Sequence, residues 1–102
     1  MGIDVYLENE NGDKLEVVSD EKYIFAHLLE ASNLARTICL RFVDPYGDAT
    51  FNFLQAPLLK EEIEKLLLST TEPTTLLQLQ KIISLIEKCQ SGKNLYIKFY
   101  GD

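Results

Sequence analysis

The chain contains few of the residues from which metal or redox chemistry is built. It has two cysteines, one histidine and no tryptophan among 102 residues. A structural zinc site needs four ligands, and Cys39 and Cys89 lie far apart without CxxC spacing, so neither a zinc site nor a disulfide framework is supported. We expect two free thiols in a reducing compartment, no metal and no cofactor.

Long apolar runs and the signatures of common enzyme families are also missing. No segment approaches the ~18 apolar residues that are needed to span a bilayer. The opening segment MGIDVYLENENG has neither the basic region nor the apolar core of a signal peptide. GxGxxG, Walker, HExxH and GxSxG motifs are absent. We therefore expect a cytoplasmic protein without membrane attachment, and the sequence supports no enzyme class.

Clusters of basic residues are absent as well. The formal net charge is −6, and residues 1–30 account for all of it, whereas acids and bases balance over residues 31–102. An acidic field repels phosphate, so we do not expect nucleic acid as a partner. A basic protein is the partner that this charge favours, although a solvated acidic face explains the same pattern. The acids of the first segment are Asp4, Glu8, Glu10, Asp13, Glu16, Asp20, Glu21 and Glu30.

The apolar pattern predicts a single α+β domain over residues 1–102, a length that is sufficient to bury a core. Alternation of apolar and polar residues predicts five strands, over residues 2–8, 14–18, 36–43, 49–54 and 95–100. Helical spacing predicts three helices, over 20–34, from Pro57 onward, and from Pro73 to before Gly92. The predicted order is ββαββααβ, a two-layer sandwich with a mainly antiparallel five-stranded sheet and three helices on one face.

The first predicted hairpin turns at Asn11-Gly12, two residues that readily adopt positive φ. In its second strand, Leu15 and Val17 are expected to point toward the core. Ser19 is the expected N-cap of the first helix, because a serine followed by acidic residues is a common helix start.

The segment DPYGDATFNFLQ, residues 44–55, gathers polar side chains that have two interpretations. Asp44 and Asp48 carry the oxygen ligands of a cation site. Asp44 and the residues that follow also have the chemistry of a tight hairpin turn, which is the interpretation we favour. The turn leaves Asn52 unexplained, because asparagine is disfavoured in strands, and Asn52 and Gln55 stay open for a role beyond the hairpin.

Three residues with reactive side chains lie outside any recognisable motif. His27 falls on the flank of the first predicted helix, and a boundary residue is a simpler interpretation than a catalytic one. Cys39 is expected on the uncovered sheet face without a neighbour that lowers its pKa, so we do not predict a nucleophile. Cys89 falls on an apolar helix stripe and is expected in the core.

The uncovered face of the predicted sheet is the surface that is left for function. Tyrosine and arginine are enriched at protein interfaces, although tyrosine also suits any half-exposed strand. The favoured hypothesis is a small acidic protein-binding module that uses this face or the acidic N-terminal hairpin. The alternative is a small-molecule-binding or catalytic domain with a cleft on the same face. The candidate binding residues are Tyr6, Arg41, Asn52, Tyr96, Lys98 and Tyr100.

Self-association is a further possibility that needs no foreign partner. We expect the last strand or the first hairpin to form an edge of the sheet, and an uncapped edge invites pairing with a second copy. Tyr6, Tyr96 and Tyr100 on the uncovered face would suit a two-fold interface. A homodimer is therefore predicted alongside a heterologous partner.

Two segments carry a resemblance to known sequences. DPYGDATFNFLQ followed by a helix, and the C-terminal LYIKFYGD, resemble segments of small uncharacterised bacterial proteins that also open with MGxDVYL-like strands. The resemblance implies a bacterial protein and no particular activity. Small acidic single domains include toxin-neutralising immunity proteins, and this comparison is an analogy of class.

Overall fold

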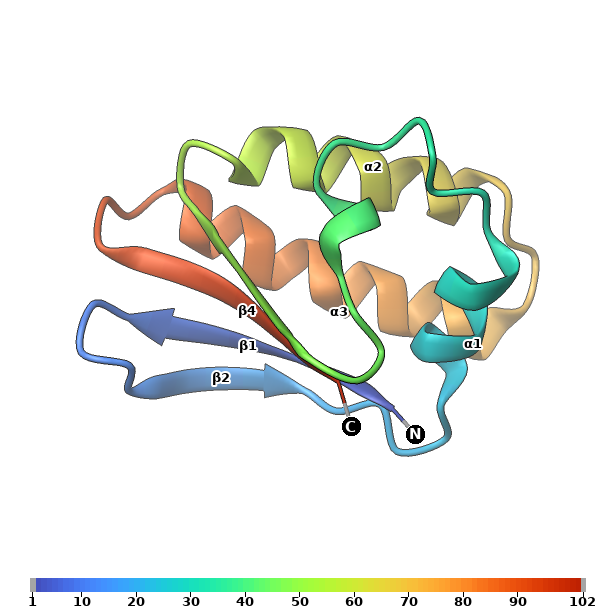
Figure 1. Cartoon of the computed structure of the whole chain (residues 1–102), viewed down its shortest axis with the longest axis horizontal. Helices are drawn as coiled ribbons and strands as arrows, with labels where there is room; N and C mark the ends of the chain where they lie inside the picture. Colours follow the sequence, from blue (N-terminus) through green and yellow to red (C-terminus); the bar gives the residue numbers. More distant parts are fainter. Residues whose placement is uncertain (1, 102) are drawn as a thin grey trace.

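The computed structural model describes residues 2–101 (Figure 1). Its strands are β1 (Ile3–Asn9), β2 (Lys14–Val18), β3 (Asp48–Asn52) and β4 (Leu95–Gly101). Its α-helices are α1 (Ile24–Ala31), α2 (Ala56–Leu68) and α3 (Pro73–Gln90), and a 3₁₀ turn, η1, covers Leu40–Phe42. The predicted α+β class with three helices is confirmed.

The sheet has four strands in the order β2-β1-β4-β3, and every neighbouring pair is antiparallel. The predicted fifth strand does not exist. Figure 1 shows the three helices together on one side of the sheet. Strand β4 lies in the middle of the sheet, so the prediction of an edge at the last strand is wrong, while the first hairpin supplies one edge through β2.

The core lies between the two central strands and the helices. Val5, Ile97 and Phe99 are fully buried and share the helix-facing side of β1 and β4. Phe99 stacks on Phe25 of α1 at 6.0 Å and meets the ring of Phe51 edge-on at 5.7 Å between centroids. Since a fully buried apolar side chain contributes about 1.5–3 kcal/mol, these residues fix the helices on this face.

Residues 36–43, predicted as a strand, instead form a loop that ends in η1. The reason is Glu62 of α2, whose buried carboxylate accepts hydrogen bonds from the backbone N–H groups of Ile38 (2.6 Å), Cys39 (3.1 Å) and Leu40 (2.9 Å). Three consecutive donors on one carboxylate curl the backbone and prevent ladder pairing. Burial does not alternate here, because Cys39 and Leu40 are both buried.

The side chains of β2 that point toward the helices also differ from those predicted. Val17 pairs with Tyr6 and Glu16 pairs with Leu7, and residues that pair across antiparallel strands share a face. Val17 therefore points away from the helices, and Glu16 points toward them. The register shifts between Leu7 and Glu8, which leaves Leu15 in a bulge. Leu15 and Val17 are 49% and 48% exposed rather than inward.

Helix α1 begins four residues later than predicted, and Asp20 rather than Ser19 organises its start. The Asp20 carboxylate, 2% exposed, accepts hydrogen bonds from the backbone N–H groups of Phe25 and Ala26, both at 2.9 Å. It also accepts from Ile3 N–H at 3.0 Å and from Gln78 Nε2 at 2.8 Å. One side chain thus joins the starts of α1 and β1 to α3.

Most turn and helix-end predictions are confirmed. Gly12 has φ 82° in the first hairpin and donates from its N–H to the Asn9 carbonyl at 3.1 Å, whereas Asn11, expected to share the positive φ, does not adopt it. Pro57 lies in the first turn of α2, and Pro73 opens α3, whose N-cap Glu72 accepts from Thr74 N–H at 2.9 Å. Helix α3 ends at Gln90, ahead of Gly92, as predicted.

The 44–55 segment contains the predicted turn but not the predicted hairpin. Asp44 Oδ1 accepts from Tyr46 N–H at 2.8 Å, and Gly47 N–H donates to the Asp44 carbonyl at 3.2 Å. Strand β3 pairs with β4, and residues 36–43 form no strand that could complete a hairpin with it. Asn52 ends β3: its Oδ1 accepts from the N–H groups of Leu54 and Gln55, while Gln55 Oε1 accepts from Asn52 N–H. These bonds give both polar side chains a structural role.

Candidate functional site

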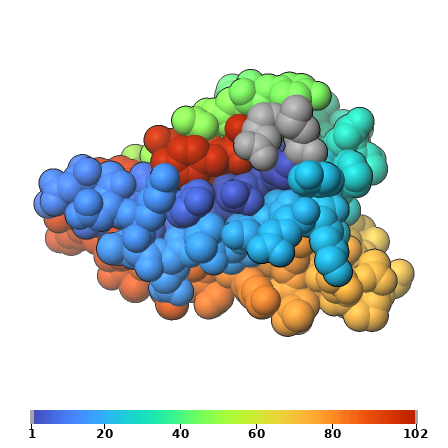
Figure 2. All heavy atoms as spheres, turned by 90° about the horizontal axis from the view of Figure 1, so that it is seen from below, coloured from blue at the N-terminus to red at the C-terminus, as the bar shows by residue number. Residues whose placement is uncertain are grey.

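The candidate site is the side of the sheet that no helix covers, here called the open face. Figure 2 shows the four strands side by side from below, with α3 visible only along the border next to β2. Cross-strand pairing places Tyr6 beside Lys98, Glu8 beside Tyr96, and Thr50 beside Lys98 on the other side. The open face consists of Asp4, Tyr6, Glu8, Lys14, Val17, Asp48, Thr50, Asn52, Tyr96, Lys98 and Tyr100.

At the centre of the open face two tyrosines and two lysines form a contact cluster. The rings of Tyr6 and Tyr100 meet edge-to-face, with centroids 5.0 Å apart. Lys14 Nζ lies 4.9 Å from the Tyr6 centroid and 5.0 Å from the Tyr100 centroid, and Lys98 Nζ lies 4.7 Å from the Tyr100 centroid. Such cation–π contacts contribute about 0.5–1 kcal/mol each at exposed positions. The cluster therefore orders side chains that would otherwise move freely.

A buried acid anchors the cluster at one end. The Tyr100 hydroxyl donates to Glu8 Oε2 at 2.7 Å, and Glu8 is only 6% exposed although it belongs to the open face. The Tyr100 side chain beside Lys98 is the main cause that raises the pKa of Lys98, and the charges of Glu8 and Asp48 act in the same direction. The Lys98 ammonium lies over the Tyr100 ring at the middle of the face.

The structure brings together most, but not all, of the predicted binding residues. Tyr6, Tyr96, Lys98 and Tyr100 lie on the open face, and Asn52 lies at its end with its side-chain oxygen used in the turn. Arg41 does not belong to the face, because it lies in η1, where its guanidinium sits 5.0 Å from the Phe42 ring.

Lys14 was missed by the sequence reasoning. In a regular ladder Lys14 would share a face with Glu16, on the helix side; the bulge at Leu15 turns it to the open face opposite Glu8. No residue in KLEVV signals a bulge, so the sequence carried no indication of this lysine in the cluster.

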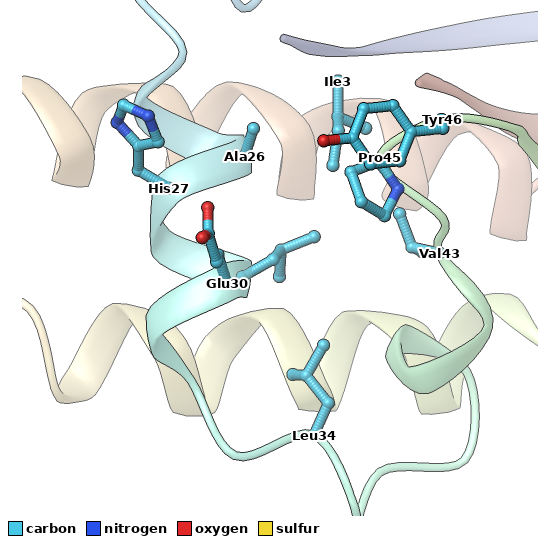
Figure 3. Close-up of a pocket in the computed structure, with 9 residues that line it drawn as sticks. Ile3, Ala26, His27, Glu30, Leu34, Val43, Pro45 and Tyr46 are labelled. Atoms are coloured by element: carbon cyan, nitrogen blue, oxygen red, sulfur yellow. The ribbon is translucent and has the colours of Figure 1, made fainter. Parts of the chain in front are cut away.

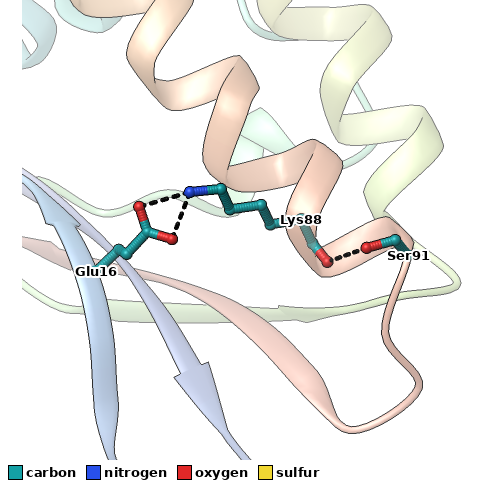
Figure 4. A network of polar contacts seen from close by, with 3 residues as sticks. All are labelled: Glu16, Lys88 and Ser91. Atoms are coloured by element: carbon teal, nitrogen blue, oxygen red, sulfur yellow. Dashed lines mark hydrogen bonds and ion pairs between the residues drawn. The ribbon is translucent and has the colours of Figure 1, made fainter.

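The acidic N-terminal third is largely used inside the fold. Asp20 and Glu8 accept the hydrogen bonds described above, Asp4 Oδ1 accepts from Asp20 N–H at 2.7 Å, and Asp13 Oδ2 accepts from Asn9 Nδ2 at 3.1 Å. Glu16 forms an ion pair with Lys88 of α3 at 2.6 Å. The backbone carbonyl of Lys88 accepts a hydrogen bond from Ser91 Oγ (Figure 4). Among the described residues Glu10, Glu21 and Glu30 have no such partner.

Two cavities lie mainly outside the open face. The first, about 420 Å³, lies between α1 and residues 43–46, with His27 and Glu30 among its lining residues (Figure 3). The second, about 360 Å³, lies between the β2–α1 connection and the first half of α3, and it reaches the open face only at Val17. Neither is centred on the open face, where the small-molecule hypothesis placed its site.

The two thiols lie in the interior. Cys39, predicted to be accessible on a strand, is buried because the loop around Glu62 turns it inward. Burial, followed by the nearby Glu62 charge, raises the pKa of Cys39. Burial raises the pKa of Cys89 to about 11, against a smaller lowering effect of a hydrogen bond from the Ile97 backbone. Both groups are therefore protonated near neutral pH and are weak nucleophiles.

Over residues 2–101, no three His, Cys, Asp or Glu side chains are grouped to hold a metal ion. In the same range none of the helices combines the length and the apolar character of a membrane span. Comparison of the chain with protein-family models, with curated proteins and with solved structures gave no match.

Proposed function

We propose that this chain is a small protein-binding domain that engages its partner through the open face. The observation that carries the proposal is the ordered cluster of Tyr6, Tyr100, Lys14 and Lys98 on an uncovered sheet. Tyrosine combines a large contact area with few rotatable bonds, and it is enriched among residues that dominate binding energy.

Pre-organisation of the cluster supports this function. Binding normally requires about 0.5–1.5 kcal/mol to immobilise each flexible side chain at an interface. Here Tyr100 is already held by Glu8 and Tyr6, and Lys98 is already held over Tyr100. A partner would therefore meet a surface whose aromatic residues need little further ordering.

An acid that the fold leaves free supports a basic partner. Glu10 lies at the exposed tip of the first hairpin, beside the end of the open face that Glu8 and Tyr96 form. A carboxylate at the rim of an interface acts mainly on encounter rates and favours a basic partner. We propose a basic protein of the cytoplasm, in the manner of immunity proteins that neutralise toxins, and a binding role rather than catalysis.

Capture from a lysate of the source organism tests the proposal. Three immobilised baits are compared: the native chain, the double variant Tyr6→Ser/Lys98→Ala, and Lys81→Ala, an exposed lysine of α3 outside the open face. Mass spectrometry should identify a protein that the native chain and Lys81→Ala retain and the double variant loses. A partner retained equally by all three baits, with the double variant folded by circular dichroism, would contradict the open face as its binding surface.

A homodimer through β2 is a second assembly that one observation favours. Strand β2 is an edge of the sheet, and its Leu15 and Val17 are about half exposed. An edge strand with exposed apolar side chains can pair with the same strand of a second copy, which gives a two-fold contact. We propose weak self-association at this edge, and its test is given below.

A further inference from the structure

The larger cavity has mainly apolar walls and a polar rim. Helix α1, the residues before and after Pro45, and the start of β1 enclose it (Figure 3). Its volume, about 420 Å³, falls within the roughly 300–1,000 Å³ of small-molecule sites. The apolar walls are Ile3, Ala26, Leu29, Leu34, Val43 and Pro45.

Three residues with polar side chains, His27, Glu30 and Tyr46, belong to the lining of this cavity. Figure 3 shows the Glu30 carboxylate on the α1 side and the Tyr46 hydroxyl pointing from the opposite side toward α1. His27 lies one turn before Glu30 on the same helix, with its ring 6.4 Å from that of Tyr23. Glu30 is the acidic member of this lining.

The charges around the cavity favour a positively charged ligand. Glu30 is exposed and, among the described residues, it has neither an ion pair nor a side-chain hydrogen bond, so its charge is available. The first thirty residues carry the whole net charge of −6, and they supply one side of the cavity. A carboxylate ligand would meet this negative field, whereas a cation would be attracted to it.

We propose that this cavity binds a small primary amine with an apolar body, whose ammonium group pairs with Glu30 while its hydrocarbon part packs between Leu29 and Val43. The Tyr46 hydroxyl then offers an acceptor for a second ammonium hydrogen. The site lies on the helix side of the molecule and is separate from the open face. The amine site and the protein-binding face can therefore be tested separately.

Titration of the ¹⁵N-labelled chain with 2-phenylethylamine tests the proposal, with 3-phenylpropionate as a probe of similar shape and opposite charge. The variants are Glu30→Gln and, as a matched control, Glu64→Gln, an exposed glutamate of α2 that forms no ion pair among the described residues. The amine should produce saturable shifts at the amides of residues 26–30 and 43–46. Glu30→Gln should weaken its binding at least about fivefold, as loss of a ~1 kcal/mol ion pair implies, and Glu64→Gln should leave it unchanged.

Three results would overturn the amine site. One is an absence of saturable shifts around the cavity at millimolar amine. Another is an affinity for 3-phenylpropionate that equals that for the amine. The third is equal binding of the amine by Glu30→Gln and by Glu64→Gln, which would show that the carboxylate of α1 takes no part.

Discussion

The Tyr100 hydroxyl on β4 donates a 2.7 Å hydrogen bond to the Glu8 carboxylate on β1, across the face that no helix covers. The bond joins two strands at the centre of the sheet and buries an acid in a region that would otherwise be open to water. It orients the Tyr100 ring so that Tyr6 and Lys14 can pack against it. The order of the proposed interface thus depends on this pair.

Removal of the Tyr100 hydroxyl should destabilise the fold. Tyr100→Phe keeps the ring but leaves a buried carboxylate oxygen of Glu8 without its donor, and a hydrogen bond to a charged group contributes about 1.5–3 kcal/mol. We expect the free energy of unfolding in urea to fall by about 1.5 kcal/mol. Tyr46→Phe is the control, because the Tyr46 hydroxyl is exposed. Equal stabilities of the two variants would show that the Tyr100–Glu8 bond contributes nothing.

Asp20 should make the free energy of unfolding depend on pH. Burial raises the pKa of Asp20, but hydrogen bonds from Ile3, Gln78 and the start of α1 outweigh it, and the pKa lies below its ordinary value of 3.8. The contribution of the ionised group is therefore complete above 3.8 and is lost as the pH falls through the lower folded pKa. Asp20→Asn should reduce the free energy of unfolding by about 2 kcal/mol at neutral pH.

The measurement is urea unfolding of the native chain and of Asp20→Asn at about pH 6 and about pH 3. The stability difference between the two should shrink at the lower pH, because below 3.8 the unfolded native chain takes up a proton at Asp20 that the folded chain resists. The exposed neighbour Glu21, changed to Gln, should show little difference at either pH. A difference between Asp20→Asn and the native chain that is constant with pH would contradict the role given to the charge.

Glu62 should hold the 38–40 loop. Glu62→Gln replaces one acceptor oxygen with an amide NH₂ that faces the donor N–H of Ile38 or Leu40, so at least one buried donor loses its partner. We expect a loss of about 2 kcal/mol in the free energy of unfolding and faster amide exchange at residues 38–40. Glu61→Gln, on an exposed ion pair with Lys65, should change neither. Unchanged exchange in Glu62→Gln would show that the loop is held by packing alone.

Strand β2 should control self-association if the proposed homodimer forms. Val17→Lys places a charge on the exposed side of the edge strand and should weaken pairing with a second copy, because inward or edge lysines oppose strand addition. Leu68→Lys is the control, since Leu68 at the end of α2 is highly exposed. Sedimentation should show a concentration-dependent dimer for the native chain and the control, and a monomer for Val17→Lys. A native chain that stays monomeric at high micromolar concentration would end the homodimer proposal.

Local patterns predicted the elements whose causes are local. Alternation in 2–8 and 95–100, the Asn11-Gly12 turn and the proline at the start of α3 depend on residues next to one another, and these features are present. Four of the six candidate binding residues also lie together, because the alternation of β1 and β4 is regular.

The failures have distant causes. RTICLRFV alternates like a strand, but Glu62, more than twenty residues later, captures its backbone donors. KLEVV contains apolar residues at Leu15 and Val17, yet the register that pairs Val17 with Tyr6 and Glu16 with Leu7 turns Val17 away from the helices and Glu16 toward Lys88 of α3. Asp20 and its partners Ile3 and Gln78 meet only in the folded chain. The pattern of residues that are adjacent in the sequence contains no information about these distant contacts.

The five tyrosines provide the most direct test of the open face as a binding surface. Tyr6, Tyr96 and Tyr100 lie on it, whereas Tyr23 precedes α1 and Tyr46 lines the cavity. The measurement is the ¹³C spectrum of tyrosine rings in the labelled chain, recorded before and after addition of the captured partner. The proposed function predicts shifts or broadening of the rings of Tyr6, Tyr96 and Tyr100, with Tyr23 and Tyr46 unchanged; changes confined to Tyr23 and Tyr46 would contradict it.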